Sequence, residues 1–466
     1  MRLARVVAIW NRVQTMEAVL SIEDLARRTE QSVEQLRQWH ACGLLGGTEQ
    51  DQFASQDVER VRLIRLFLRK GIDLPTIVDW VRRGEMERHL AMLGTRAGGP
   101  TYSVAEAAQR LHLEVGLLRR VLEVIGLAEG PLADEDLEAL RMCKTGLDIG
   151  FPAEAMVQFV RVFADAMRRV AETEAHLFYF YIRRTLQERG LPPAELTRAV
   201  ALASDGVETI AEPALLYFHR MALRHAIEDT AIMELAEQAG ILGPPELPGQ
   251  LRAVIVFVDM TGFTALTEAM GDLKTAEVLD RFSALVRQAV GRWDGHVVKQ
   301  IGDAFMLTFD DPADAVHCAL EIERRTAAEP QFPSVRSGIH CGPVLYRDGD
   351  YVGANVNLAS RVAAESERHQ VLVTGAVRRE VTALSDVEFV RLPKRRLKGL
   401  TEEIDLFEAR ASAGDRATRV VDPVCRMELG PGEVAARLAL DGTERAFCSE
   451  ECLRRFVATP ERYATT

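Results

Sequence analysis

Apolar residues recur at three- and four-residue intervals through the first half of the chain. This is the period of helices that bury one face. One such series is Val157, Val160, Phe163, Met167 and Val170. From residue 253 the pattern changes to continuous β-branched runs such as AVIVFVDM, which are typical of buried strands. The pattern predicts an α+β multidomain protein with an all-α N-terminal half, a following α/β block and a small cysteine-containing C-terminal module.

Three stretches rich in Gly, Pro or small polar residues divide the chain, at residues 94–101, 240–250 and 411–418. Clusters of this kind between periodic segments are typical of linkers. The longest apolar runs, such as residues 177–182, are far too short to span a bilayer. The N-terminal residues also lack the long apolar segment of a secretory signal. We therefore expect a cytoplasmic protein without a membrane partner.

The first half contains an internal repeat. The segment that begins at Leu20 aligns with the one that begins at Tyr102, and the segment from Asp57 aligns without a gap with the one from Asp136. Ser21 opens the first copy as a predicted helix cap, and Ser103 occupies the same place in the second copy. Two copies of one helical unit with helix-turn-helix spacing are the simplest interpretation.

The first copy resembles the MerR family in its turn, second helix and GLL segment, with the recognition residues falling on 32–38. The resemblance implies a MerR-like domain at 1–95, a degenerate second unit at 101–170 and a helical regulatory or dimerisation connector at 171–245. Residues 1–95 carry 14 Lys and Arg against 13 Asp and Glu, and the whole chain has a net charge of −12. Since DNA binding needs a basic excess, we favour a packing or sensing role, with DNA as the less favoured partner.

Candidate chemistry begins in the α/β block. Asp259 ends a predicted buried strand, and a helix is expected to start at the next turn, so that the backbone amides of Gly262, Phe263 and Thr264 would form a phosphate site. About forty residues later, Asp303 lies at the tip of a predicted hairpin. Either Asp alone could be a turn or capping residue. Together beside a helix N-terminus they suit paired divalent cations that hold a triphosphate.

A third motif follows in SGIHCGPV (337–344), predicted as a strand that turns into a loop, and in RDGDYVGANVNLASRV (347–362). Asn357 and Arg361 are four residues apart on a predicted helix and so share a face. Taken together, the three motifs resemble the catalytic domain of class III nucleotidyl cyclases over residues 251–410. The resemblance implies a ferredoxin-like α/β fold and conversion of ATP to cyclic AMP.

The resemblance also implies residue roles. Asp259, Asp303 and the carbonyl of Met260 would bind two Mg²⁺ or Mn²⁺ ions, while Asn357 would position the ribose and Arg361 would stabilise charge on the α-phosphate. Lys398 matches a triphosphate-binding lysine through the short motif RRLKGL. The acceptor of the proton from the ribose hydroxyl stays open among water, a substrate phosphate and Asp259.

Lys299 and Asp350 match the family's base-reading pair. A Lys donor with an Asp acceptor fits the N1 and N6 edge of adenine, whereas guanine reverses that polarity. We therefore expect an adenylate cyclase, with a guanylate cyclase as one alternative and a MerR-like regulator with a silent, nucleotide-sensing cyclase domain as the other. In the family, the metal-binding half and the base-reading half of one site come from different subunits, which implies a homodimer with shared sites.

The tail from residue 418 to 466 resembles the YHS module in its DPVC start and its later FCS…C segment. Cys448 and Cys452 are one helical turn apart, and Cys425 could join them around a Zn or Cu ion. A fourth ligand is not evident, so a thiol switch and a metal-free fold stay open as alternatives. The remaining cysteines are expected to be buried single thiols, at positions 42, 143, 318 and 341.

Overall fold

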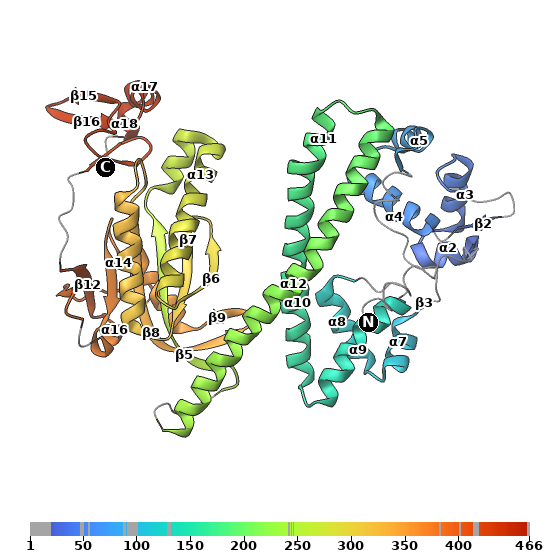
Figure 1. The fold of residues 1–466 in the computed structure, drawn as a ribbon, viewed down its shortest axis with the longest axis horizontal. Helices are drawn as coiled ribbons and strands as arrows, with labels where there is room; N and C mark the ends of the chain where they lie inside the picture. The colour runs from blue at the N-terminus through green and yellow to red at the C-terminus, as the bar shows by residue number, and fades with distance from the viewer. Residues whose placement is uncertain are drawn as a thin grey trace. The chain divides into compact units, whose positions relative to one another are not determined.

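The computed structural model describes residues 20–463, with gaps at 47–50, 55, 87–89, 91–100, 128–131, 241–242, 244, 246, 382–383, 400–401 and 413–418. The chain divides into two compact units, Met1–Ile241 and Leu242–Thr466. Figure 1 labels many of the elements of both units. In the described part of the chain, no helix combines the length and the apolarity needed to span a membrane.

The first unit contains the predicted repeat. The first copy consists of β1 (Leu20–Ser21), α2 (Ile22–Thr29), α3 (Val33–Ala41), β2 (Gln52–Phe53), α4 (Gln56–Arg69) and α5 (Leu74–Arg82). The second copy repeats this order as β3 (Thr101–Tyr102), α7 (Val104–Leu111), α8 (Val115–Ile125), β4 (Leu132–Ala133) and α9 (Asp134–Asp148). Ser21 and Ser103 cap α2 and α7 as predicted, and Ser103 forms a capping box with Glu106. Each copy buries its own apolar core.

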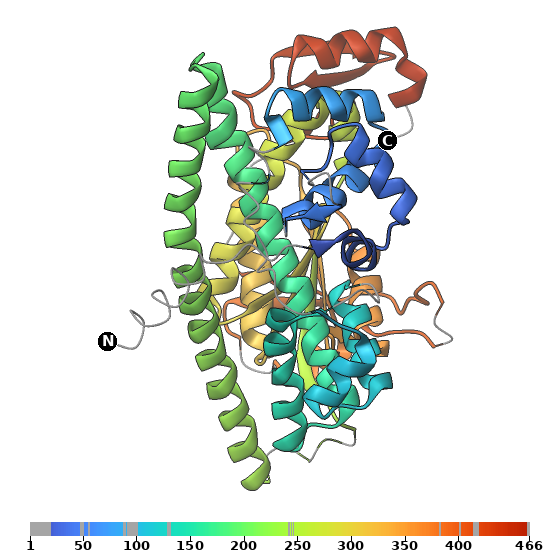
Figure 2. The same ribbon diagram turned by 90° about the vertical axis from the view of Figure 1, so that its right-hand side faces the viewer.

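The end of the first unit is almost entirely helical. It comprises α10 (Ala153–Leu177), the π-helix η1 (Phe178–Arg183), α11 (Arg184–Glu188) and α12 (Pro193–Gln238). Figure 2 shows α12 as one long green helix, although Pro213 lies inside it. Of the predicted apolar face of α10, Val157 and Val160 are buried, whereas Phe163 and Met167 are exposed. The predicted helix is confirmed, and Phe163 lies edge-on to the ring of His219 on α12, with 6.0 Å between the ring centroids.

The second unit is built on a mixed eight-stranded sheet in the order β11-β12-β10-β8-β5-β7-β6, with β9 paired to β8. Its strands are β5 (Gln250–Met260), β6 (His296–Ile301), β7 (Ala304–Phe309), β8 (Val335–Arg347), β9 (Asp350–Val352), β10 (Val371–Thr374), β11 (Val387–Arg391) and β12 (Leu406–Ala411). Helices α13 (Phe263–Arg292) and α14 (Pro312–Ala328) fall between them in a β-α-β-β-α-β order, β5 to β8, which is the connectivity that a ferredoxin-like fold requires.

The two faces of β5 have different neighbours. Val254, Val256 and Val258 belong to the cluster that also contains the buried residues of α13 and α14, whereas Ile255 belongs to a second cluster with Val356 of α15 (Ala354–Glu365). This alternation follows from the two-residue period of a strand. Asp259 lies in phase with Ile255, so the sheet presents this carboxylate on the α15 face.

One strand is longer than predicted. The segment 337–344 does not turn into a loop; β8 continues to Arg347, because β5 begins at Gln250 and pairs with it as far as Leu345. A tight hairpin then returns the chain as β9, which places Asp350 opposite Arg347. Gly338 of β8 permits close packing of α15, since a Cβ there would lie 2.1 Å from the backbone nitrogen of Ala363.

The C-terminal module packs directly on the sheet domain. It contains β13 (Val420–Val421), β14 (Glu428–Leu429), β15 (Ala436–Leu440), β16 (Thr443–Phe447), α17 (Glu450–Ala458) and α18 (Pro460–Tyr463). Its buried residues, among them Phe447 and Phe456, belong to the same apolar cluster as the core of the sheet domain. The amide of Glu428 also donates to the carbonyl of Phe332, at 3.2 Å. Module and sheet domain therefore share one core.

Candidate active site

Two carboxylates meet at one end of the sheet. Asp259 is the penultimate residue of β5, and Asp303 occupies the turn between β6 and β7. Because β5 pairs with β7 with Asp259 opposite Ala304, the two acids are next to each other in register. Burial raises the pKa of Asp303, and the charge of Asp259 raises it further. The amide of Met260 donates to the backbone carbonyl of Asp303, at 3.4 Å. This close pair suits hard, oxygen-ligated cations.

Asp259 has a partner that the motifs did not indicate. Nε and Nη2 of Arg336 donate to Oδ2 of Asp259, at 2.9 and 2.6 Å, from the directly paired position on β8. Nη1 of the same arginine donates to the carbonyl of Ala364. Arg336 thus orients Asp259 and compensates its charge. In the sequence, the one indication was that Arg336 comes immediately before the SGIHCGPV motif.

The predicted phosphate site lies beside these acids. Gly262 caps α13 with φ of 78°, a left-handed conformation suited to glycine, so the amides of Phe263 and Thr264 are at the start of the helix as predicted. Two arginines that were not predicted flank this turn. A Cβ on Gly262 would lie 2.7 Å from Cβ of Arg426 and 3.8 Å from Nη2 of Arg368. Burial and the charge of Arg426 lower the pKa of Arg368.

The predicted base-reading residues contact each other. Nζ of Lys299, on β6, donates to Oδ2 of Asp350, on β9, and both side chains are about one third exposed. The other oxygen, Oδ1, accepts from the amide of Tyr351 at 2.8 Å. The hairpin that follows the unexpectedly long β8 therefore brings Asp350 to Lys299. The Lys299 ammonium, a donor, and the Asp350 carboxylate, an acceptor, therefore lie side by side where solvent reaches them.

Asn357 and Arg361 both lie on α15, one turn apart as predicted, with Asn357 exposed and Arg361 half-buried. The guanidinium of Arg361 lies against the RRLKGL turn, since a Cβ on Gly399 would be 3.2 Å from its Nη2. Lys398 is the exposed residue before that glycine. The structure therefore places Arg361 and the Lys398 turn together within one chain.

A second cluster of polar groups lies in the C-terminal module. Sγ of Cys448 is 3.5 Å from Sγ of Cys425 and 3.6 Å from Sγ of Cys452, so the three predicted thiols do converge. Asp422, which sequence reasoning missed, completes a buried group of four. The sequence did offer one indication of this ligand, since Asp422 comes three residues before Cys425 in the segment Asp-Pro-Val-Cys. Hydrogen bonds from Cys425 and Cys448 lower the pKa of Cys452, whereas the same network raises that of Cys425.

The other cysteines follow the expectation with one exception. Cys143, Cys318 and Cys341 are buried, and burial raises the pKa of Cys318 to about 12. Cys42 is exposed, so its predicted burial is wrong. It follows α3 directly and precedes Gly43, where the chain turns away from the helix at the surface.

Comparison with known families agrees with this geometry. The family model of the adenylate and guanylate cyclase catalytic domain matches residues 250–407. The sheet domain is a class III cyclase domain. A YHS domain matches residues 420–466, and an adenylate cyclase regulatory domain matches residues 38–227. The cyclase domain is thus preceded by a regulatory region, and the family model found there is not of the MerR type.

Curated relatives of this cyclase-containing chain extend beyond the catalytic domain. It is 28% identical over 389 residues to the pH-sensitive adenylate cyclase MT1302 of Mycobacterium tuberculosis, covering 80% of this chain and 91% of that protein. It is 29% identical over 293 residues to an adenylate cyclase of Streptomyces coelicolor, covering 61% and 73%. Among solved structures, the adenylyl cyclase CyaB of P. aeruginosa matches 36% of this chain and 97% of its own, with 20% identity and a TM-score of 0.32. An adenylate cyclase of Trypanosoma brucei matches 38% and 94%, with 22% identity and a TM-score of 0.34.

Proposed function

We propose that this chain is an adenylate cyclase that converts ATP to 3′,5′-cyclic AMP and pyrophosphate. The observation that carries the proposal is the meeting of Asp259 and Asp303 at adjacent strand ends, beside the start of α13. Relatives named adenylate cyclases over most of the chain support the same activity.

The donor set fits Mg²⁺ or Mn²⁺, because two carboxylates and the carbonyl of Met260 are hard oxygen ligands. Two such ions, when bound, would lower the pKa of the ribose 3′-hydroxyl and neutralise charge on the leaving pyrophosphate. Asp259 and Asp303 would hold these ions, and Arg336 would keep Asp259 in its ligating orientation. The amides of Gly262, Phe263 and Thr264 would bind the triphosphate at the positive end of α13.

Arg361 and Asn357 would act from the α15 face. A guanidinium offers several donors in a rigid fork, which suits the crowded oxygens of the α-phosphate in the transition state. Asn357, one turn earlier, would position the ribose so that its hydroxyl is in line with phosphorus. Lys398 would bind the departing phosphates, because the guanidinium of Arg361 lies against the turn that carries Lys398.

The Lys299–Asp350 pair supports ATP as the substrate. Lys299 would donate to adenine N1, and Asp350 would accept from the N6 amino group. Guanine presents a donor at N1 and an acceptor at O6, so its edge would oppose both residues. A guanylate cyclase is therefore the weaker candidate.

We further propose that two chains share each site, the acids from one and the Lys299 and Arg361 set from the other. Exposed apolar side chains on α10, η1 and α12, including Phe163, Tyr181 and Phe218, offer a surface that a second copy would cover. Mixing an Asp259→Ala chain with an Arg361→Ala chain should then restore one intact site per heterodimer. If the mixture stays as inactive as each variant alone, sites are not shared.

The N-terminal half would regulate this activity. We place its two helical repeats at 1–95 and 101–170 and a connector at 171–245; each repeat has two short helices after a two-residue strand that pairs with a second short strand. The balanced charge of residues 1–95 favours packing over DNA binding. A silent cyclase domain in a transcription regulator would instead give salt-sensitive DNA binding without a cyclic product.

The deciding assay incubates the purified chain with Mn²⁺ and either ATP or GTP and separates the nucleotides. We expect cyclic AMP from ATP and much less cyclic GMP from GTP. Asp303→Asn, which removes one ligand charge at nearly constant volume, should abolish both products, whereas Asp348→Asn in the exposed β8–β9 turn should leave them unchanged. A folded, dimeric sample that forms neither product would refute the proposal.

A further inference from the structure

The buried group formed by Asp422, Cys425, Cys448 and Cys452 has the geometry of a closed metal site. One ligand atom from each residue lies within 4.8 Å of all the others, and no member is more than 7% exposed. A Zn–S bond of about 2.3 Å at the tetrahedral angle separates two sulfurs by about 3.8 Å, whereas a disulfide separates them by about 2.05 Å. The observed separations of 3.5 and 3.6 Å are close to the metal-bridged value.

A disulfide or a cluster of free thiols would account for the three cysteines but not for the buried carboxylate of Asp422 beside them. Its Oδ1 accepts from the amides of Val424 and Cys425, and its Oδ2 accepts from that of Cys448 at 2.8 Å. In the described part of the chain, no Lys or Arg forms an ion pair with it. A fully buried carboxylate among three thiols is costly unless a cation is present. Oδ2, which accepts from one amide only, keeps a lone pair for such a cation.

The donor set selects the class of ion. Three thiolates with one carboxylate in a tetrahedral arrangement suit Zn²⁺, while Mg²⁺ and Ca²⁺ require more oxygen ligands. This site would therefore take a different ion from the acids Asp259 and Asp303. With all four positions filled by protein, it has no open position for substrate, and its role would be structural or regulatory.

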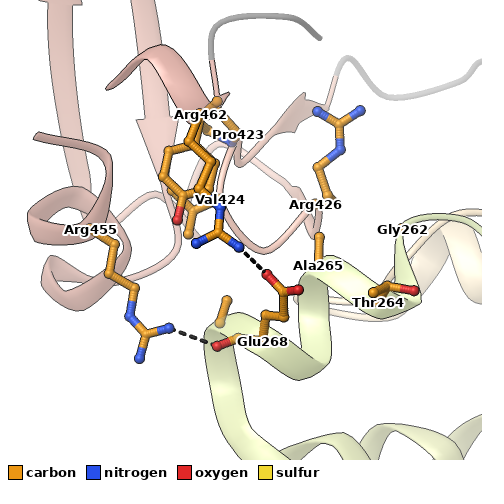
Figure 3. A pocket seen from close by; sticks show the side chains of 11 residues that line it. Gly262, Thr264, Ala265, Glu268, Pro423, Val424, Arg426, Arg455 and Arg462 are labelled. Carbon is orange, nitrogen blue, oxygen red and sulfur yellow. Dashed lines mark hydrogen bonds and ion pairs between the residues drawn. The ribbon is translucent and has the colours of Figure 1, made fainter. Parts of the chain in front are cut away.

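Both elements that carry the ligands also touch the nucleotide-binding side of the cyclase domain. Cys425 precedes Arg426, which has a left-handed φ of 67° and packs on Gly262. Cys452 lies in the first turn of α17, and Arg455 on the same helix donates to the carbonyl of Glu268 in α13, at 2.8 Å. Figure 3 shows the hydrogen bond from Arg455 to Glu268 beside a pocket of about 380 Å³, which Gly262 and Arg426 also line.

We propose that a Zn²⁺-class ion bound by Asp422, Cys425, Cys448 and Cys452 crosslinks the Arg426 loop to α17 and thereby fixes the turn at Gly262 that binds the triphosphate. This inference rests on the proposed cyclase function for its catalytic consequence only. Loss of the ion would release Arg426 and the turn together. Affinity for ATP would fall, whereas the chemical step, which depends on Asp259 and Arg361, would change little.

The test starts from the full-length wild-type chain. Elemental analysis after removal of loosely bound Mg²⁺ should find about one Zn²⁺ per chain, and Co²⁺ exchanged into the site should give thiolate-to-cobalt charge-transfer absorption. Chelator-treated protein should unfold at a lower temperature and recover on addition of Zn²⁺, because an ion that binds only the folded state stabilises it. Absence of Zn²⁺ and of the cobalt absorption, or a disulfide between these cysteines, would overturn the metal site.

Two variants distinguish metal binding at the four-residue group from the proposed effect of that metal on ATP binding at the Gly262 turn. Cys448→Ser should lose the ion and raise KM for ATP roughly fivefold, the factor that corresponds to one net hydrogen bond, with little change in kcat. The matched control is Cys143→Ser, a buried thiol elsewhere. Arg426→Gly should keep the ion, because glycine fits the left-handed φ, yet raise KM similarly. An unchanged KM in both variants would refute the coupling. A wild type without cyclic product would refute the proposed function alone, since metal content and unfolding temperature are measured independently.

Discussion

His369 joins the cyclase domain to the C-terminal module through two carboxylates. Its Nε2 lies 2.7 Å from both carboxylate oxygens of Glu428 on β14, and its Nδ1 lies 3.1 Å from Oε1 of Glu323 on α14. The imidazole is only 16% exposed. Burial opposes its charge, but the two carboxylates prevail and raise the pKa of His369 to about 9. Arg368 also faces Glu428, at 4.0 Å. We therefore expect a charged histidine at neutral pH.

The contribution of charged His369 to the free energy of unfolding follows from the linkage between protonation and folding. A rise from 6.5 to about 9 corresponds to about 3 kcal/mol of unfolding free energy, at about 1.4 kcal/mol per pKa unit. Because the folded-state pKa is the higher one, this contribution is complete below pH 6.5, declines between pH 6.5 and 9, and is absent above pH 9. His369→Gln removes the titrating group, so it should lower stability at pH 6 by up to this amount and much less at pH 9.5.

The measurement needs a signal from the second unit alone. Trp293 is the single tryptophan after residue 242, so its resonance in fluorotryptophan-labelled protein reports that unit during urea unfolding. The difference between wild type and His369→Gln should close as the pH rises from 6 to 9.5. A difference that stays constant with pH, or that is absent at pH 6, would refute the assignment of a charged, doubly paired histidine. His317→Gln, at a more exposed single pair with Asp386, serves as the control.

Three further predictions concern the cyclase domain. Gly338→Ala should lower the unfolding free energy by more than about 2 kcal/mol in urea titration, because its Cβ would overlap the backbone of α15, whereas Gly291→Ala in open space should be neutral or stabilising. Exchange of the base-reading pair, Lys299→Glu with Asp350→Lys, should shift the ratio of kcat/KM for ATP over GTP by at least about tenfold toward GTP; an unchanged ratio would contradict the base assignment. Arg336→Met should reduce kcat by about 10- to 100-fold at saturating Mn²⁺, with partial activity in Arg336→Lys, since it orients a ligand rather than binding the ion. Full activity in Arg336→Met would exclude that role.

The sequence was sufficient wherever function depends on local order. Asp259 at a strand end, Gly262 at a helix start and the one-turn spacing of Asn357 and Arg361 are set by short-range patterns, and the structure places all four as expected. The length of β8 was not predictable in this way. It depends on where β5 begins, because Gln250, the first residue of β5, pairs with Leu345, which lies 95 residues later in the chain.

Residues whose partners are distant in sequence were the ones missed. Arg336 is 77 residues from Asp259, and only the register of β5 and β8 brings them together. Asp422 was not recognised as the fourth ligand, because only the fold brings Cys448 and Cys452 to it. Arg426 was also missed, because its contact with Gly262 requires the packing of the module on the cyclase domain.

The core shared by the sheet domain and the last 45 or so residues has a practical consequence for anyone who dissects this chain. A fragment that stops before Val420 would uncover Phe332, which is 1% exposed in the intact chain, together with other apolar side chains. The tail by itself is too short to sustain an interior of its own. Kinetic constants from a truncated catalytic piece would therefore describe a damaged surface rather than the native enzyme.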